Sequence, residues 1–205
     1  MDVFLFPMVN VTLFPKTTKP LPIFEPRYIQ MFRQSVATQT PVAIGFNDNP
    51  SALGQTTPGS KVDFVREIAG YGSAQIVEER ANGTLLVFVH GLGKVKLGNV
   101  KASETTFIVC EAEKVLENTI LDPKVAPLIH GLNNVLARWI HTHIPDPGQR
   151  DIFMKNLTGP EEIVGAFASY LVKDYDFQQM ILEFDNINDK VHYLHRLAES
   201  AEIMI

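Results

Sequence analysis

Short runs of apolar residues fill the first 117 residues, and Gly, Pro and Asn separate them. Within several runs, apolar and polar side chains alternate, which is typical of β-strands because successive side chains point to opposite faces. The pattern predicts strands at Val3–Phe6, Val11–Phe14, Leu21–Ile23, Val42–Phe46, Val62–Ile68, Gly72–Glu79, Leu85–His90, Lys94–Leu97 and Phe107–Glu113. One helix is expected in this half, from Pro26 to Ala37, because its apolar residues recur at helical spacing.

Turn-forming residues indicate where these predicted strands end. Asn82-Gly83 separates QIVEERA from TLLVFVH, and this dipeptide favours a hairpin with a type I′ turn. Pro7 is expected to end the first strand. Pro20 and Pro22 flank Leu21, which predicts an edge strand, because proline cannot donate a ladder hydrogen bond. Phe24 is expected to anchor the start of the following helix.

After residue 118 the apolar period changes to 3.6, which is typical of amphipathic helices. The longest stripe runs from Val125 to Ile140 and is expected to end before the IPDPG sequence at 144–148. Asp122 before Pro123 suits a helix N-cap, and Thr158 with Glu161 has the spacing of a capping box. Further helices are predicted at about 151–156, 158–173, 177–184 and 187–198.

These periods predict an α+β protein. Residues 1–117 would form a β-rich domain, an antiparallel barrel or curled sheet, because closure removes exposed edges. Residues 118–205 would form a helical bundle. The 47–61 segment between two predicted strands is long and rich in turn formers, and such loops are often functional.

Composition narrows the classes of function. The net charge is −5 and the pI is near 5.7, so no overall basic field attracts nucleic acid. Cys110 is the only cysteine, which excludes an intrachain disulfide and fits a reducing compartment. Asp2 and Pro7 interrupt what would be a signal peptide, and no run approaches the length of a membrane span. A cytoplasmic protein without membrane association is therefore expected.

The opening FPMVNVTLFPKTTKPLPIFEPRY resembles the amino-terminal, substrate-recognition domain of Lon proteases, with its FPG, P-L-x-I-F-E-x-R-Y pattern. Lys16 stands where glycine is common. GSAQIVEERANGTLLVFVHGLGKVKL is similar to a later hairpin of that family, with Lys94 in place of an arginine. QMILEFDNINDKVHYL resembles its C-terminal helices, with Asp189 and Lys190 replacing Glu-Arg. The resemblance covers nearly the whole chain.

This resemblance implies a PUA-like pseudo-barrel followed by a helical bundle, and a role in protein recognition. We therefore expect a stand-alone, non-catalytic module, without a cofactor, that binds unfolded or apolar-aromatic protein segments. An ATPase or protease is a candidate partner. The residues agree, because the string nearest to a phosphate-binding loop, HGLGKVKL, lacks its spaced first glycine and its Ser/Thr.

The candidate peptide-binding residues are Leu21, Ile23, Phe24 and Leu53. Leu21, Ile23 and Phe24 belong to the predicted edge strand or directly follow it, and such an edge can accept a peptide by β-addition. Leu53 lies in the long 47–61 loop.

Two other readings stay open. An enzyme or metal site would need the scattered histidines, His130, His141, His143, His192 and His195, to converge with carboxylates in a pocket. Nucleic-acid binding would need a local basic face, for which the sequence offers Lys61, Arg66, Lys94, Lys96 and Lys101.

Overall fold

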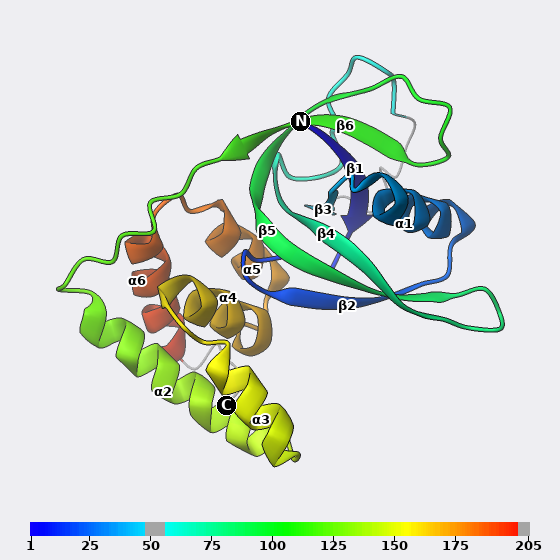
Figure 1. The fold of residues 1–205 in the computed structure, drawn as a ribbon. Coiled ribbons are helices and arrows are strands. Elements are labelled where there is room, and N and C mark those ends of the chain that lie inside the picture. The colour runs from blue at the N-terminus through cyan, green and yellow to red at the C-terminus, as the bar shows by residue number, and fades with distance from the viewer. Residues whose placement is uncertain (48–55, 201–205) are drawn as a thin grey trace. The chain divides into compact units, whose positions relative to one another are not determined.

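The computed structural model describes residues 1–47 and 56–200, which separate into two compact units, Met1–Val115 and Leu116–Ile205. The first unit contains β1 (Asp2–Met8), β2 (Thr18–Ile23), α1 (Pro26–Thr38), β3 (Val42–Phe46), β4 (Ile68–Glu79), β5 (Leu85–Val100) and β6 (Ile108–Val115) (Figure 1). The second contains α2 (Ala126–His143), α3 (Pro147–Lys155), α4 (Pro160–Leu171), α5 (Tyr175–Glu183) and α6 (Ile187–Glu199). The predicted α+β class is confirmed, whereas the predicted division into domains of residues 1–117 and 118–205 stays a prediction.

One mixed sheet forms the first unit, with strand order β2-β5-β4-β3-β1-β6. The long strand β5 also pairs with β6, which closes five of the strands into a barrel and leaves β2 outside it as an edge strand. The N-terminal half of β5 pairs with β2, and its C-terminal half pairs with β6. Only β1 and β3 run parallel. The sequence predicted two strands where β5 is one.

Strand β1 is buried on both faces and separates two apolar clusters. Phe4 and Phe6 point to the cluster under α1, together with Phe32 and residues of β2 and β5. Val3 and Leu5 point to the second cluster, which lies inside the closed part of the sheet and also contains Cys110. Burial raises the pKa of the Cys110 thiol to about 11, so this side chain is an inert core residue.

The segment Val11–Phe14 is not a strand, although its pattern predicted one. Instead, the backbone of this segment crosses the sheet at close range, because two glycines of the sheet have no side chain that would block it. A Cβ on Gly70 would lie 1.9 Å from the Leu13 carbonyl oxygen, and one on Gly91 would lie 2.1 Å from the Phe14 carbonyl oxygen. Leu13 and Phe14 are therefore buried without joining a ladder.

Lys16 turns the chain from this crossing segment into β2. Its φ is +62°, in the left-handed region that normally favours glycine. The Lys16 N–H donates to the Gly91 carbonyl at 2.9 Å, and the Gly91 N–H donates to the Thr17 carbonyl at 2.8 Å. These bonds hold a lysine in a backbone conformation that L-residues disfavour.

Two further boundaries differ from the prediction. Strand β1 continues through Pro7 to Met8, because β6 pairs only as far as Leu5 and no partner there needs the missing N–H. The predicted strand Val62–Ile68 is irregular up to Ile68, and its Phe64 and Val65 fill the second apolar cluster from a loop.

The β4–β5 hairpin forms as predicted, but its turn is not type I′. Gly83 has φ +82°, whereas Asn82 has no positive φ. The Gly83 N–H donates to the Arg80 carbonyl at 2.8 Å, and the Arg80 N–H donates to the Thr84 carbonyl at 2.9 Å. This is the three-residue loop in which one left-handed glycine completes the turn.

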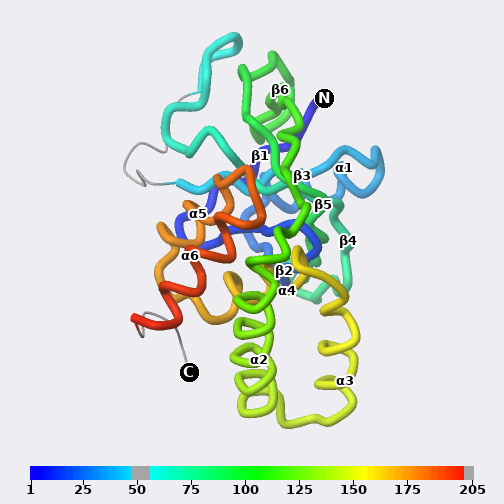
Figure 2. Tube along the Cα trace, turned by 90° about the vertical axis from the view of Figure 1, so that its left-hand side faces the viewer, coloured from blue at the N-terminus to red at the C-terminus, as the bar shows by residue number. Residues whose placement is uncertain are grey.

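Helix caps in the second unit also differ from the sequence signals. Helix α2 begins after Val125, because Asp122 caps a preceding turn by accepting from the Lys124 N–H at 2.8 Å. Gly159, not Thr158, precedes α4. Figure 2 shows α2 and α3 as neighbouring helices joined by a short turn, where Asp146 accepts from the Gln149 N–H at 2.7 Å.

The segment that precedes α2 is fixed to the start of α6. Asn118 donates its N–H to the Asp185 carbonyl at 2.8 Å, and its own carbonyl accepts from the Ile187 N–H at 2.9 Å. Beside these bonds, Glu117 forms an ion pair with Lys190 at 2.5 Å. The Lys190 side chain is only 3% exposed and that of Glu117 11%, so this pair lies in a medium where a lone charge is costly.

We predict that Lys16→Gly stabilises the protein by about 0.5–1 kcal/mol, because glycine removes the cost of the left-handed backbone and adds a smaller entropic cost. Chemical denaturation followed by circular dichroism measures the change. Lys16→Ala keeps a Cβ and should give no gain. Equal stabilisation by Ala and Gly would show that the lysine side chain, not the backbone, carries the strain.

We predict that Glu117→Leu lowers the free energy of unfolding of the helical unit by about 3–5 kcal/mol, because it removes a partner of the buried Lys190 ammonium. Trp139, the only tryptophan, lies in this unit and reports its unfolding by fluorescence. Glu117→Leu with Lys190→Met should recover most of the loss. Glu199→Leu, at an exposed carboxylate of α6, is the control and should change stability little.

Candidate functional site

An apolar groove opens on the first unit where β1 and β2 end and α1 begins. Its volume is about 180 Å³, and we call it the anchor groove. Its walls are formed by Phe6, Pro7, Met8, Val9, Pro22, Ile23, Phe24, Glu25, Arg27, Tyr28 and Asn47. Drug-sized pockets span roughly 300–1,000 Å³, so this groove suits a single anchoring side chain better than a whole small molecule.

Tyr28 shapes the wall of the anchor groove. Its ring packs edge-on against Phe6 with centroids 4.6 Å apart, and the Arg27 guanidinium carbon lies 4.5 Å from the ring centroid on α1. Tyr28 and Arg27, with Pro7, also line a smaller cavity of about 60 Å³ that reaches Phe107. These three residues therefore form a partition between two openings.

The rim of the anchor groove is electrically balanced. Arg27 forms an ion pair with Glu25 at 2.8 Å, and both side chains are exposed. Burial raises the pKa of Tyr28, partly offset by Arg27, so its phenol stays a neutral hydrogen-bond donor at neutral pH. The groove consequently presents apolar surface and one hydroxyl group, with little net charge.

Two side chains at the groove are exposed although they are apolar. Phe24 is 69% exposed and Val9 40%. The expectation that Phe24 anchors α1 is wrong, because Tyr28 fills that position against Phe6. Single exposed apolar residues are common, but here both border a concave apolar surface, which is typical of binding sites.

The structure brings together two of the four predicted peptide-binding residues. Ile23 and Phe24 both line the anchor groove, and Leu21 is buried in the core beneath α1. Leu53 lies outside the described residues. Sequence analysis missed the contributions of Met8 and Val9, because the predicted end of β1 at Pro7 left them in an unassigned turn.

The free edge of β2 is poor in hydrogen-bond donors. The Gly91 N–H bonds to the Thr17 carbonyl, so odd-numbered residues of β2 direct their backbone groups toward β5 and even-numbered residues direct theirs outward. The outward positions include Pro20 and Pro22, which have no N–H. A peptide added along this edge would leave its own carbonyls unpaired, so the structure favours binding through side chains over β-addition.

The histidines do not converge on a site. His141 Nδ1 accepts a hydrogen bond from Arg150 at 2.8 Å, which occupies one ring nitrogen. His143 stacks on Trp139 with ring centroids 4.6 Å apart and donates from Nδ1 to the Trp139 carbonyl. Among residues 1–47 and 56–200, no group of three or more His, Cys, Asp or Glu side chains is placed to hold a metal ion.

The lysines proposed for a nucleic-acid surface are either bound to carboxylates or buried. Lys61 and Lys96 both bind Glu67, at 2.9 and 3.3 Å, and Lys101 binds Asp2 at 2.8 Å. Lys94 is only 2% exposed. A phosphate backbone would have to displace these carboxylates, which makes this surface unfavourable for nucleic acid.

Within the described part of the chain, no helix is long and apolar enough to cross a membrane.

The fold is a β-barrel unit with an apolar groove, followed by helices. Residues 2–200 match the family model described as the ATP-dependent protease La (LON) substrate-binding domain, so the chain belongs to this family. It is 21% identical to the Lon protease of Buchnera aphidicola subsp. Acyrthosiphon pisum (strain APS) over 196 residues, and 22% identical to that of Endomicrobium trichonymphae over 204 residues. These matches cover 96% and 97% of this chain but only 24% of each relative.

Solved structures share the fold over nearly the whole chain. The Lon N-terminal domain protein from Xanthomonas campestris superposes with a TM-score of 0.65 at 15% identity, covering 95% of this chain and 96% of that one. The N-terminal domain of Mycobacterium avium complex Lon protease gives a TM-score of 0.70 at 14% identity, covering 97% and 98%. At these identities the likeness shows the fold alone.

We predict that Pro20→Thr with Pro22→Thr promotes self-association, because it places two amide donors on the free edge of β2. Sedimentation velocity at increasing protein concentration measures the effect. Pro58→Thr, in a turn outside the sheet, is the control and should leave the protein unchanged. A monomeric double variant at all concentrations would mean that the prolines are not what blocks edge pairing.

Proposed function

We propose that this chain is a non-catalytic recognition module that binds apolar or aromatic segments of other proteins in the anchor groove. One observation carries the proposal. In a domain of the LON substrate-binding family, the exposed Phe24 and the largely buried Tyr28 border the same small apolar groove. Such a groove can hold one apolar side chain of a protein that has lost its fold.

The chemistry of the groove supports this class of partner. Its balanced rim gives no preference for a charged ligand, and its apolar walls gain free energy only by removing apolar surface from water. The Tyr28 hydroxyl adds one donor for a backbone carbonyl of the bound segment. Because a single anchor contributes little against the cost of ordering a flexible chain, affinities of roughly micromolar to millimolar are expected.

Weak and unselective binding fits a module that presents proteins to other machinery. We propose that an ATPase or protease acts on the segments held here, and that the chain itself carries neither activity. The names of the Lon relatives and the family description support this partner, while the chain matches only 24% of each relative's length.

The test is an NMR titration of the isotope-labelled chain with a short peptide that carries one phenylalanine among small residues. Amide shifts should concentrate at Met8, Val9 and Ile23–Arg27. Phe24→Ser should weaken binding about fivefold or more, because it removes an exposed apolar wall, and should change stability by less than about 0.5 kcal/mol.

Val36→Ser is the matched control, because Val36 is 42% exposed on α1 and does not line the anchor groove. Its affinity for the peptide should equal that of the unmodified chain. Raising the salt concentration should also leave binding largely intact. If Phe24→Ser bound as well as the unmodified chain, or if the shifts lay on the helices of residues 126–199, the anchor groove would not be the binding site.

A further inference from the structure

A second opening on the first unit shares no residue with the anchor groove. It has a volume of about 700 Å³ and is bordered by the start of β1, by β5 and β6, and by the loop before β4. Leu97, Gly98 and Ala112 supply small or apolar surface to its lining. The rest of the lining is largely charged, so we call it the mixed-charge groove.

The mixed-charge groove has more lysine ammonium groups than carboxylates that bind them. Lys61 and Lys96 both bind Glu67, at 2.9 and 3.3 Å, so two ammonium groups share one carboxylate. Hydrogen bonds from Lys61 and Lys96 lower the pKa of Glu67, which therefore stays ionised at neutral pH. Lys114 adds another cation, 6.0 Å from the ring centroid of Tyr71.

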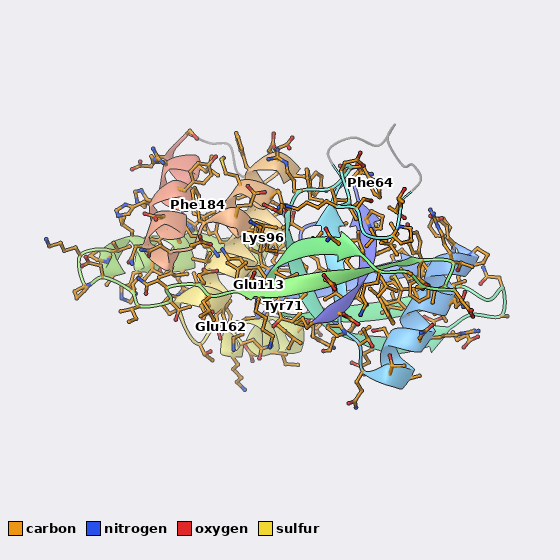
Figure 3. All side chains as sticks on the ribbon, turned by 90° about the horizontal axis from the view of Figure 1, so that it is seen from above. Phe64, Tyr71, Lys96, Glu113, Glu162 and Phe184 are labelled. Carbon is orange, nitrogen blue, oxygen red and sulfur yellow. The ribbon has the colours of Figure 1, made fainter. Side chains whose placement is uncertain are left out.

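Two carboxylates of the mixed-charge groove lie on β6. Glu111 and Glu113 are two residues apart, so their side chains leave the same face of the strand. Glu113 is directly opposite Lys96 in the ladder, as Figure 3 shows for these labelled residues, yet the Lys96 ammonium binds Glu67. Within residues 1–47 and 56–200, no hydrogen bond or ion pair reaches the side-chain carboxylate of Glu111 or Glu113. The pKa of Lys101 is nevertheless raised by its hydrogen bond to Asp2 and, to a smaller extent, by the charge of Glu111.

The lining carries charges of both signs in separate places. Lys61 and Lys96 together exceed the single charge of Glu67, and Lys114 adds a further cation, while Glu111 and Glu113 are both negative. Asp2 also lines the groove, and it is paired with Lys101 at 2.8 Å. The two carboxylates would repel a purely anionic ligand such as a phosphate chain, and the lysines would repel a purely cationic ligand. Only an occupant with both signs complements this arrangement.

We propose that the mixed-charge groove binds an extended protein segment in which an acidic and a basic residue flank a small apolar residue. The acidic side chain binds Lys61 and Lys96, and the basic side chain binds Glu111 or Glu113. The small middle residue points away from the sheet, as alternate side chains of an extended segment do. Lys61 and Lys96 are 66% and 51% exposed, which lets a passing chain reach them without a conformational change. This surface is additional to the anchor groove and recognises charge instead of apolar bulk.

The experiment is an NMR titration of the full labelled chain with the blocked pentapeptide Gly-Glu-Ala-Lys-Gly, alongside Gly-Gln-Ala-Gln-Gly. The charged peptide should shift amides near Leu97, Gly98 and Ala112. Its affinity should fall about fivefold in Glu111→Gln with Glu113→Gln. It should also fall several-fold when salt rises from about 0.05 M to about 0.5 M, because exposed charges are screened.

Glu78→Gln with Glu79→Gln is the matched control, because it removes two exposed carboxylates of β4 that do not line the groove. Affinity for the charged peptide should be unchanged in this control and in Phe24→Ser, because neither variant alters the mixed-charge groove. A negative result with the charged peptide does not bear on the anchor groove, which the phenylalanine peptide tests separately. Equal binding of the Gln-Ala-Gln peptide would overturn the proposal, as would an unaffected Glu111/Glu113 variant. Binding of a single-stranded oligonucleotide to the same amides in preference to the charged peptide would also overturn it.

Discussion

The packing of Tyr28 against Phe6 is the contact on which the anchor groove depends. It joins the first turn of α1 to the end of β1, with ring centroids 4.6 Å apart. The contact therefore covers the apolar core beside the anchor groove. The same ring forms the partition between the two small cavities. Because both Phe6 and Arg27 contact the Tyr28 ring, the groove is formed before any ligand binds.

Prolines then decide how this part of the molecule can bind a partner. Strand β2 lies at the edge of the sheet, where exposed backbone donors and acceptors would invite another strand. Pro20 and Pro22 stand at the outward positions and remove those donors. The edge is thereby protected from association with other chains, and recognition passes to the side chains at the end of β2.

Much of this fold could be predicted from the sequence because the signals were local. The period change near residue 118, the Asn-Gly hairpin and the helix from Pro26 depend on neighbours a few residues away. The errors came from distant contacts. Val11–Phe14 alternates like a strand, but the space left by Gly70 and Gly91 draws its backbone across the sheet.

The site was partly predictable for the same reason. The resemblance to the Lon amino-terminal domain drew attention to Ile23 and Phe24, which follow one another in the sequence. No sequence pattern could show that Met8 and Val9 would lie beside them, since the ends of β1 and β2 come together only in the folded unit. The mixed-charge groove was also invisible, because the pairing of Lys96 with Glu67 in place of Glu113 depends on the β4–β5–β6 geometry.

The most direct test of the account is an isotope-filtered NOE experiment on the complex of labelled chain with an unlabelled phenylalanine-containing peptide. Its central claim is that an apolar side chain of the partner enters the anchor groove. The account predicts NOEs from the peptide ring protons to the side chains of Met8, Phe24 and Tyr28. NOEs confined to other surfaces, or to the helices of residues 126–199, would contradict it.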